Sequence, residues 1–222
     1  MTFIHFVNRI LKVYNTLYIV FCHFINMEVE VAVNTKANVI RISDPPIAQA
    51  LLENPKWSWI WLIARLYLGY TWLESGIGKL SNPGWTQTGE ALKGFWERAV
   101  LIPDAPARPA ITFGWYRAFL QGMLDAGSYT WFSKLIVAGE LLVGAALILG
   151  MFTGIAAFFG GFLNWNFMMA GTASANPVLF TISVLLILAW KTAGWLGLDR
   201  FILPALGTPW QPGKVFSPEK TE

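Results

Sequence analysis

Residues 131–170 read WFSKLIVAGELLVGAALILGMFTGIAAFFGGFLNWNFMMA, and this stretch decides the fold class. It contains two apolar runs, 131–150 and 152–170, and each is close to the ~20 residues that a helix needs to cross a bilayer. Two further runs, 57–78 and 177–197, have a similar length and character. Because a helix satisfies its own backbone polar groups in lipid, we expect an all-α integral membrane four-helix bundle.

The overall composition also indicates a membrane protein. Apolar residues make up 55% of the chain and charged residues 13%, whereas a soluble domain is about a quarter charged. The net charge is only +3, and its basic residues are dispersed, while nucleic-acid binding calls for a clustered basic face. We therefore expect the lipid bilayer as a partner, no nucleic acid, and a multi-pass location in the cytoplasmic membrane of the cell.

Cysteine and histidine are nearly absent. Cys22, His5 and His23 are the whole set, and all three precede the first run. Haem and iron–sulfur clusters need such side chains as ligands. We therefore expect no haem, no iron–sulfur cluster and no metal. Any redox chemistry would use a diffusible organic cofactor, a partner chain or both.

The predicted membrane domain, residues 57–197, lies between an N-terminal extension at 1–56 and a C-terminal tail at 198–222. Residues 3–25 are apolar but interrupted by charges such as Arg9 and Lys12. A charge at mid-membrane costs about 2.5–3.5 kcal/mol. We therefore interpret this segment as an interfacial helix, or as an upstream extension before a start at Met27. We expect residues 1–56 as a whole to be interfacial or partly disordered.

Two prolines mark helix starts in the extension. Asp44-Pro45 predicts a short helix at about 46–53, and Asn54-Pro55 predicts the start of the first span, since Asn and Asp cap helices and Pro suits the first turn. Asn176-Pro177 repeats this pattern at the start of the last span. The balance of basic residues around the spans favours both termini in the cytoplasm.

The one long connection, residues 79–130, predicts two amphipathic helices, near 86–101 and 109–124. We expect this loop to lie on the membrane as a lid outside the cytoplasm. Its aromatic side chains Trp96, Trp115 and Phe119 would face the interface, and Arg98 and Arg117 would reach water or an anionic substrate.

Ionisable residues inside spans are candidates for function. Arg65 in the first span and Glu140 in the second lie at similar predicted depths, about 12 Å and 13–14 Å from their ends at 1.5 Å per residue. We expect them to pair, as candidate catalytic residues or as an ion pair that only fixes helix register. Gly144, one turn beyond Glu140, would let a neighbouring backbone approach.

Four further residues are candidates for binding a substrate or a quinone. Lys79 can line the mouth of a cavity whose floor is Arg65–Glu140, or it can extend to the lipid headgroups. Glu74 lies near the same end of the span. Asn164 and Asn166 in the third span suit either interhelical hydrogen bonds or the carbonyls of a quinone.

Two motifs, RLYLGYTWLESGIGKL at 65–80 and ELLVGAALILG at 140–150, resemble the DoxX/DoxD family, and the resemblance covers residues 57–197. It implies a four-helix membrane bundle. One branch of the family is the membrane subunit of thiosulfate:quinone oxidoreductase, which couples two thiosulfates into tetrathionate and passes the electrons to quinone. Other members are implicated in oxidative-stress membrane complexes.

The resemblance therefore implies an oxidoreductase subunit with quinone as a diffusible acceptor. After residue 197 only a short tail remains, so the second subunit would be a small, separately encoded partner. The alternative is a non-catalytic membrane scaffold that recruits redox or stress-response partners through the long loop. A transporter ranks last, because no inverted repeat and no span broken by Gly or Pro at its middle is visible.

Overall fold

The structure is a computed structural model that describes residues 31–34, 39–42, 44–208 and 211–215. The predictions for residues 3–25 and for a start at Met27 lie outside the described residues. The chain forms two compact units, residues 1–50 and 51–222. The boundary falls within helix α2 (Pro46–Glu53), which forms where the Asp44-Pro45 pair predicts a helix.

The first unit contains a small hairpin. Strand β1 (Val31–Asn34) pairs antiparallel with β2 (Val39–Ile42), so that Val31 lies opposite Ile42. The side-chain amide of Gln49, in α2, donates a hydrogen bond of 2.7 Å to the Asp44 carbonyl. This bond helps to fix the start of α2.

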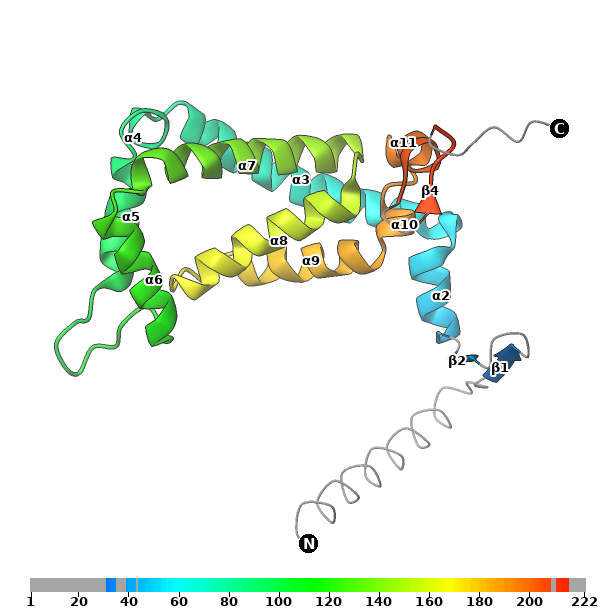
Figure 1. The fold of residues 1–222 in the computed structure, drawn as a ribbon, viewed down its shortest axis with the longest axis horizontal. Helices are drawn as coiled ribbons and strands as arrows, with labels where there is room; N and C mark the ends of the chain where they lie inside the picture. Colours follow the sequence, from blue (N-terminus) through cyan, green and yellow to red (C-terminus); the bar gives the residue numbers. More distant parts are fainter. Residues whose placement is uncertain (1–30, 35–38, 43, 209–210, 216–222) are drawn as a thin grey trace, which may run out of the picture. The chain divides into compact units, whose positions relative to one another are not determined.

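The second unit is built on four long helices. They are α3 (Ser58–Leu80), α7 (Tyr129–Leu149), α8 (Thr153–Met169) and α9 (Asn176–Leu188). Helix α3 packs along α7 and also touches α9, while α8 packs along α9 and α7 (Figure 1). In the described residues the strands are confined to two short hairpins, so the all-α prediction is confirmed.

The starts of α3 and α9 follow the predicted Asn-Pro pattern. The Asn54 side chain accepts a 3.0 Å hydrogen bond from the Lys56 amide, and Pro55 begins the single 3-10 turn η1 (Pro55–Trp57) that leads into α3. Helix α9 begins at Asn176 with Pro177 in its first turn. Pro is favoured there because an N–H in the first turn has no intrahelical acceptor, so its absence costs nothing.

The prediction of one continuous helix over 177–197 is wrong. Helix α9 ends at Leu188, and a separate single turn, α10 (Trp190–Ala193), follows Ala189. The Thr192 hydroxyl donates to the Ala189 carbonyl (3.2 Å) and lies 3.1 Å from the Leu52 carbonyl. Side-chain bonds of this kind compete with a regular helix and hold the chain at the end of α2.

Helix length limits what can cross a bilayer unaided. Within the described residues, α7 is the one helix that is both long and apolar enough to do so, and α9 is apolar but has only 13 residues. At 1.5 Å per residue α9 is about 20 Å long, short of a hydrocarbon core of ~30 Å. Helix α3 is long enough but carries three charged residues, Arg65, Glu74 and Lys79.

The long loop folds into a helical layer with its own core. It contains α4 (Pro83–Thr86), α5 (Glu90–Val100) and α6 (Gly114–Asp125), which pack against the start of α7 and the end of α8. The buried residues of this core are Leu92, Trp96, Ala99, Ile111, Tyr116, Leu120, Ile136 and Ala170.

One of the interface predictions for this loop is wrong. Trp96 is buried, and its ring centroid lies 5.6 Å from that of Phe132 in α7. Arg117 is half-buried, and its guanidinium donates to the Ile111 carbonyl. Trp115 and Phe119, by contrast, are exposed as predicted.

After α10 the chain contacts the turn between α7 and α8. Helix α11 (Asp199–Leu206) leads into a second hairpin, β3 (Gly207–Thr208) with β4 (Gln211–Pro212). The amides of Leu198 and Asp199 donate to the carbonyls of Leu149 and Gly150, at 3.1 Å and 2.8 Å. The segment is thereby fixed to the turn between α7 and α8.

Candidate functional site

Glycines set the contact between α3 and α7. A Cβ on Gly144 would lie 2.7 Å from the Leu73 amide nitrogen and 2.9 Å from the Gly69 carbonyl oxygen, so neither glycine leaves room for a side chain. Gly76 lies equally close to Leu141. The prediction that Gly144 admits a neighbouring backbone is confirmed.

This contact brings Lys79 to Glu140. The Lys79 Nζ donates to both carboxylate oxygens, at 2.9 Å and 2.8 Å, and to the Ser75 hydroxyl at 2.6 Å. Glu140 is fully buried, whereas the Lys79 side chain is 18% exposed. The same Nζ lies 5.2 Å from the centre of the Trp85 ring. All three donors of the ammonium therefore have an acceptor, and Lys79 does not extend to the headgroups.

The predicted pair of Arg65 with Glu140 is wrong. The prediction aligned the ends of the two helices, but α7 begins well beyond the end of α3, where α4 and α5 contact it. In the observed register Gly76 lies opposite Leu141, so Glu140 falls beside Lys79. Arg65 and Lys79 are fourteen residues apart on α3, about 21 Å along its axis. They therefore do not line one cavity with Glu140.

Arg65 lies instead at the turn between α7 and α8. It is 1% exposed, and its Nη2 donates a 2.9 Å hydrogen bond to the Leu196 carbonyl. A methyl on Gly150 or on Gly197 would overlap Arg65 Nη1. Two glycines without side chains thus form the space that the guanidinium occupies.

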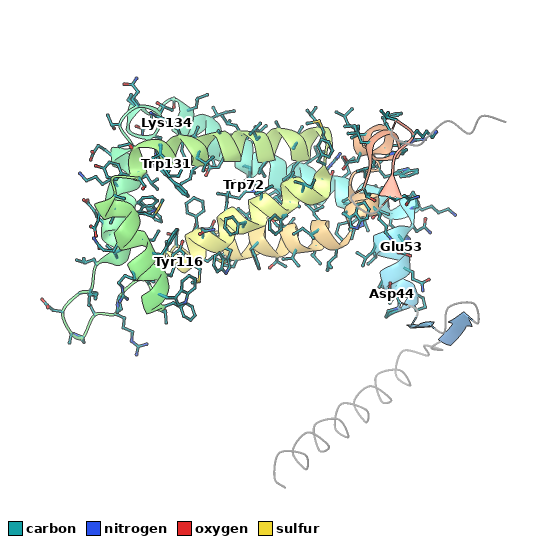
Figure 2. All side chains as sticks on the ribbon, viewed as in Figure 1. Asp44, Glu53, Trp72, Tyr116, Trp131 and Lys134 are labelled. Atoms are coloured by element: carbon teal, nitrogen blue, oxygen red, sulfur yellow. The ribbon has the colours of Figure 1, made fainter. Side chains whose placement is uncertain are left out.

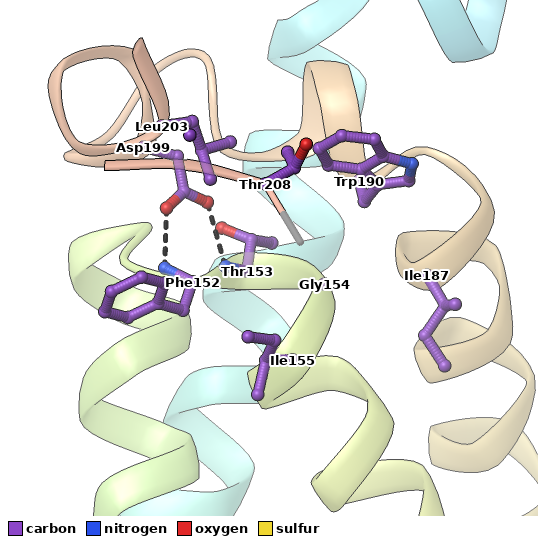
Figure 3. Close-up of a pocket in the computed structure, with 10 residues that line it drawn as sticks. Phe152, Thr153, Gly154, Ile155, Ile187, Trp190, Asp199, Leu203 and Thr208 are labelled. Atoms are coloured by element: carbon purple, nitrogen blue, oxygen red, sulfur yellow. Dashed lines mark hydrogen bonds between the residues drawn. The ribbon is translucent and has the colours of Figure 1, made fainter. Parts of the chain in front are cut away.

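Asp199 faces the same charge, and the sequence prediction did not include it. It is 3% exposed and interacts electrostatically with Arg65. Its two carboxylate oxygens accept hydrogen bonds from the amides of Phe152 (2.5 Å) and Thr153 (2.8 Å), at the first turn of α8 (Figure 3). A carboxylate there satisfies free helix N–H groups and the helix dipole.

A signal for Asp199 existed in the sequence. An arginine inside a span requires a counter-charge, and Asp199 follows the last apolar run directly. The predicted boundary at residue 197, however, assigns Asp199 to the tail.

The remaining charged candidate, Glu74, is at the surface, as are two lysines of the apolar runs. Glu74 is exposed on α3 and lies outside the Lys79–Glu140 pair. Lys134 is exposed on α7, where Figure 2 shows it close to Trp131. Lys191 forms an exposed ion pair with Glu53 at 2.8 Å, a type of contact that contributes little to stability.

The two asparagines of α8 have different surroundings. Asn164 is fully buried, and neither its oxygen nor its nitrogen has a hydrogen-bond partner among the described residues. Asn166 is half-buried, and its Oδ1 and its backbone carbonyl both accept from the Tyr116 hydroxyl at 3.1 Å. The Asn166 nitrogen donates to the Phe162 carbonyl at 2.8 Å.

An apolar cavity of about 290 Å³ lies beside the Tyr116–Asn166 contact, between the loop helices and the ends of α7 and α8. Figure 2 shows Tyr116 on α6, on the side facing α8. The cavity is lined by Leu92, Phe95, Trp96, Tyr116, Phe119, Leu120, Met123, Phe132, Ile136, Phe162, Leu163, Asn166, Phe167 and Ala170.

The polar end of this cavity is uncharged. Burial raises the pKa of Tyr116 to about 12, because the phenolate would lose its hydration. The phenol therefore remains a hydrogen-bond donor at physiological pH. Aromatic walls with one or two oriented polar groups are typical of sites for flat, uncharged rings.

Comparison with known proteins gives one match. The family model of DoxX matches residues 60–173, over half of the chain. The matched stretch includes Arg65, Lys79, Glu140 and both asparagines, but not Asp199. No curated protein and no solved structure matches the chain. Among the described residues no group of three or more His, Cys, Asp or Glu side chains is placed to hold a metal ion.

Proposed function

This chain belongs to the DoxX family, and from that premise we propose that it is the membrane subunit of a quinone-linked oxidoreductase. The quinone head binds in the cavity beside Tyr116 and Asn166. The observation that carries the proposal is the pairing of aromatic walls with one neutral phenol donor in that cavity.

The distribution of exposed residues supports a multi-pass membrane location. Polar side chains such as Glu140, Asn164 and Ser183 are fully buried, while the outer faces of α3, α7, α8 and α9 expose large apolar ones. Leu142 is 71% exposed and Ile63 is 62% exposed. Exposed apolar faces of this extent suit lipid rather than water.

The chemistry requires an electron donor, and the protons come from water. A quinone becomes a quinol by taking up two electrons and two protons. Tyr116 can donate its single O–H to one carbonyl of the ring once that proton turns away from the two acceptors on Asn166. That bond would orient the ring and strengthen as charge builds on the oxygen.

The proposed electron source is a small sulfur anion, as the DoxX/DoxD resemblance implies. Two thiosulfates joined as tetrathionate release the two electrons that one quinone accepts. Lys79 is engaged by Glu140, and Arg65 is enclosed by backbone. We therefore place the reaction of the anion on a separately encoded partner subunit, docked at the loop helices.

The test is thiosulfate-dependent reduction of decylubiquinone by membranes with and without this protein. We expect the rate to depend on the protein and to fall about tenfold in Tyr116→Phe, the loss expected for one hydrogen bond of about 1.4 kcal/mol. Tyr70→Phe, at an exposed tyrosine of α3, is the matched control. Equal rates with and without the protein would contradict the enzymatic proposal.

A second candidate function is a scaffold without catalysis. Helix α6 and the segment before it expose three large aromatic residues, Phe113, Trp115 and Phe119, at 52%, 61% and 50%. Such a surface suits a partner protein or the membrane interface. Retention of a partner by the Tyr116→Phe protein, with no quinone reduction in the wild type, would favour this function.

The proposal also places both termini in the cytoplasm and the loop helices outside. In a Cys22→Ser background, a cysteine at Arg98 or Asp104 should react with an impermeant thiol reagent on intact cells. A cysteine at Lys214 should react only after lysis. Labelling of Lys214→Cys but not of the loop cysteines would invert the topology.

A further inference from the structure

A second cavity lies at the opposite end of α8. Its volume is about 420 Å³, within the range of small-molecule sites. It is lined by Phe152, Thr153, Gly154, Ile155, Ile187, Trp190, Asp199, Leu203, Gly207 and Thr208 (Figure 3). Ile155 here and Asn166 at the first cavity are eleven residues apart, about 16 Å along the helix. The two cavities are therefore separate.

Two hydroxyl groups at this cavity have unused hydrogen-bonding capacity. Thr153 is fully buried, and its Oγ1 has no partner among the described residues. The Thr208 Oγ1 is buried and likewise has no partner within that part of the chain. A buried hydroxyl without a partner costs stability. A bound molecule with hydroxyl or carbonyl oxygens could supply the missing hydrogen-bond partners.

The charge at the cavity is balanced. Asp199 is the one ionisable residue of its lining, and its carboxylate already accepts two backbone hydrogen bonds and faces Arg65. A cation would meet the field of Arg65, and an anion would meet the carboxylate at short range. The site therefore favours an uncharged ligand.

The remaining walls are apolar and lead to an apolar surface. Phe152, Ile187, Trp190 and Leu203 supply aromatic and aliphatic side chains. Ile155 is 59% exposed, and the phenylalanines that follow it on α8 are exposed as well. In a membrane protein that surface meets lipid, so a ligand can reach the cavity from the bilayer.

We propose that this cavity binds a neutral membrane amphiphile, with its hydroxyl or carbonyl head at Thr153 and Thr208 and its apolar body along Trp190 and Leu203. Two sources share this chemistry, a neutral glycerolipid and an isoprenoid quinone. The proposal does not depend on the quinone site beside Tyr116, because the two cavities share no residue.

The experiment measures equilibrium binding of two probes, 1,2-dioctanoylglycerol and decylubiquinone, to the purified full-length protein in detergent. Thr153→Val removes the hydroxyl at nearly constant volume, and Leu203→Trp fills the cavity. We expect saturable binding of at least one probe, weakened about tenfold by Thr153→Val and more strongly by Leu203→Trp. Thr181→Val, at an exposed threonine of α9, is the matched control and should bind normally.

A stability readout separates a binding role from a structural one. Because its hydroxyl has no partner, Thr153→Val should raise the melting temperature of the ligand-free protein by ~2 °C while it lowers affinity. A structural hydroxyl would lower both. The proposal is overturned if folded wild-type protein binds neither probe, or if Thr153→Val and Leu203→Trp bind as the wild type does. Tyr116→Phe should leave binding at this cavity unchanged, so failure here is distinguishable from failure of the proposed function.

Discussion

The Lys79–Glu140 pair and the Arg65–Asp199 site lie at different ends of α3 and hold their charges in different ways. The first is a direct pair in which every ammonium donor has a side-chain acceptor. In the second, the Leu196 carbonyl, two backbone amides and two glycines surround the charged groups. The Lys79–Glu140 pair therefore depends on its side chains, whereas the Arg65–Asp199 site depends on the path of the main chain.

The two sites also differ in how much of each lies within the region that matches the family model. Lys79, Ser75 and Glu140 all lie within residues 60–173, which match the DoxX family. Of the second site, Arg65, Gly150 and the amides of Phe152 and Thr153 also lie there, but Asp199 and Leu196 come from the C-terminal segment. The Lys79–Glu140 pair therefore lies wholly within the matched region, whereas the C-terminal segment completes the second site.

The largest expected effect comes from breaking the direct pair. Lys79→Met leaves a buried carboxylate without a partner and should cost about 3–5 kcal/mol of unfolding free energy. The double variant Lys79→Met/Glu140→Leu should lose less, because no charge remains unpaired. Unfolding of the purified protein in mixed micelles measures both.

A second cycle, between Glu140→Leu and Arg65→Met, is the control. These residues are far apart on α3 and α7 and share no partner, so their effects should add within about 0.5 kcal/mol. Strong coupling between Arg65 and Glu140 would restore the pair that the sequence predicts and contradict the observed register.

The next effect tests the space around Arg65. Gly150 has φ = 65°, and a methyl there would also overlap Arg65 Nη1. Gly127 has nearly the same φ, 63°, with open space around it. Gly127→Ala should lower the unfolding free energy by ~1–2 kcal/mol, the cost of the left-handed backbone conformation alone. Gly150→Ala should cost more, about 2–4 kcal/mol, since the guanidinium must also move. Equal losses would mean that Arg65 is not held by this turn.

The sequence predicts most of the helices and the buried charges, but it does not predict which charges meet. The apolar runs give α3, α7 and α8, and the Asn-Pro pairs give the starts of α3 and α9. An arginine and a glutamate within apolar runs, and a lysine directly after one, indicate buried ion pairs. Which charges meet depends on the register between helices, which Gly69, Gly76 and Gly144 determine only once the helices are packed.

Other features depend on contacts that have no local signal. The break after Leu188 reflects the bonds of Thr192 to the ends of α2 and α9. The burial of Trp96 reflects the packing of the loop on α7. Neither can be read from periodicity, because an amphipathic helix with an aromatic face fits a protein core as well as a membrane interface.

Asp199→Asn should have an intermediate effect. The amide can still accept one backbone hydrogen bond at the start of α8, but the charge opposite Arg65 and one of the two acceptors are lost. We expect a loss of about 1–2 kcal/mol, as for a weakened helix cap next to a charge. Asp104→Asn, at an exposed loop position, is the control. No difference between the two would show that Arg65 needs no counter-charge from the C-terminal segment.

The smallest effect tests whether the first site tolerates the loss of one contact. Ser75→Ala removes one of the three acceptors of Lys79, and the two contacts to Glu140 remain. The ammonium can still turn its third donor toward water, because its side chain is 18% exposed. The loss should therefore be about 0.5–1 kcal/mol, the contribution of a single hydrogen bond with a solvent alternative. A loss as large as that of Lys79→Met would mean that Ser75 positions the lysine, and that the pair depends on its surroundings as closely as Arg65 does.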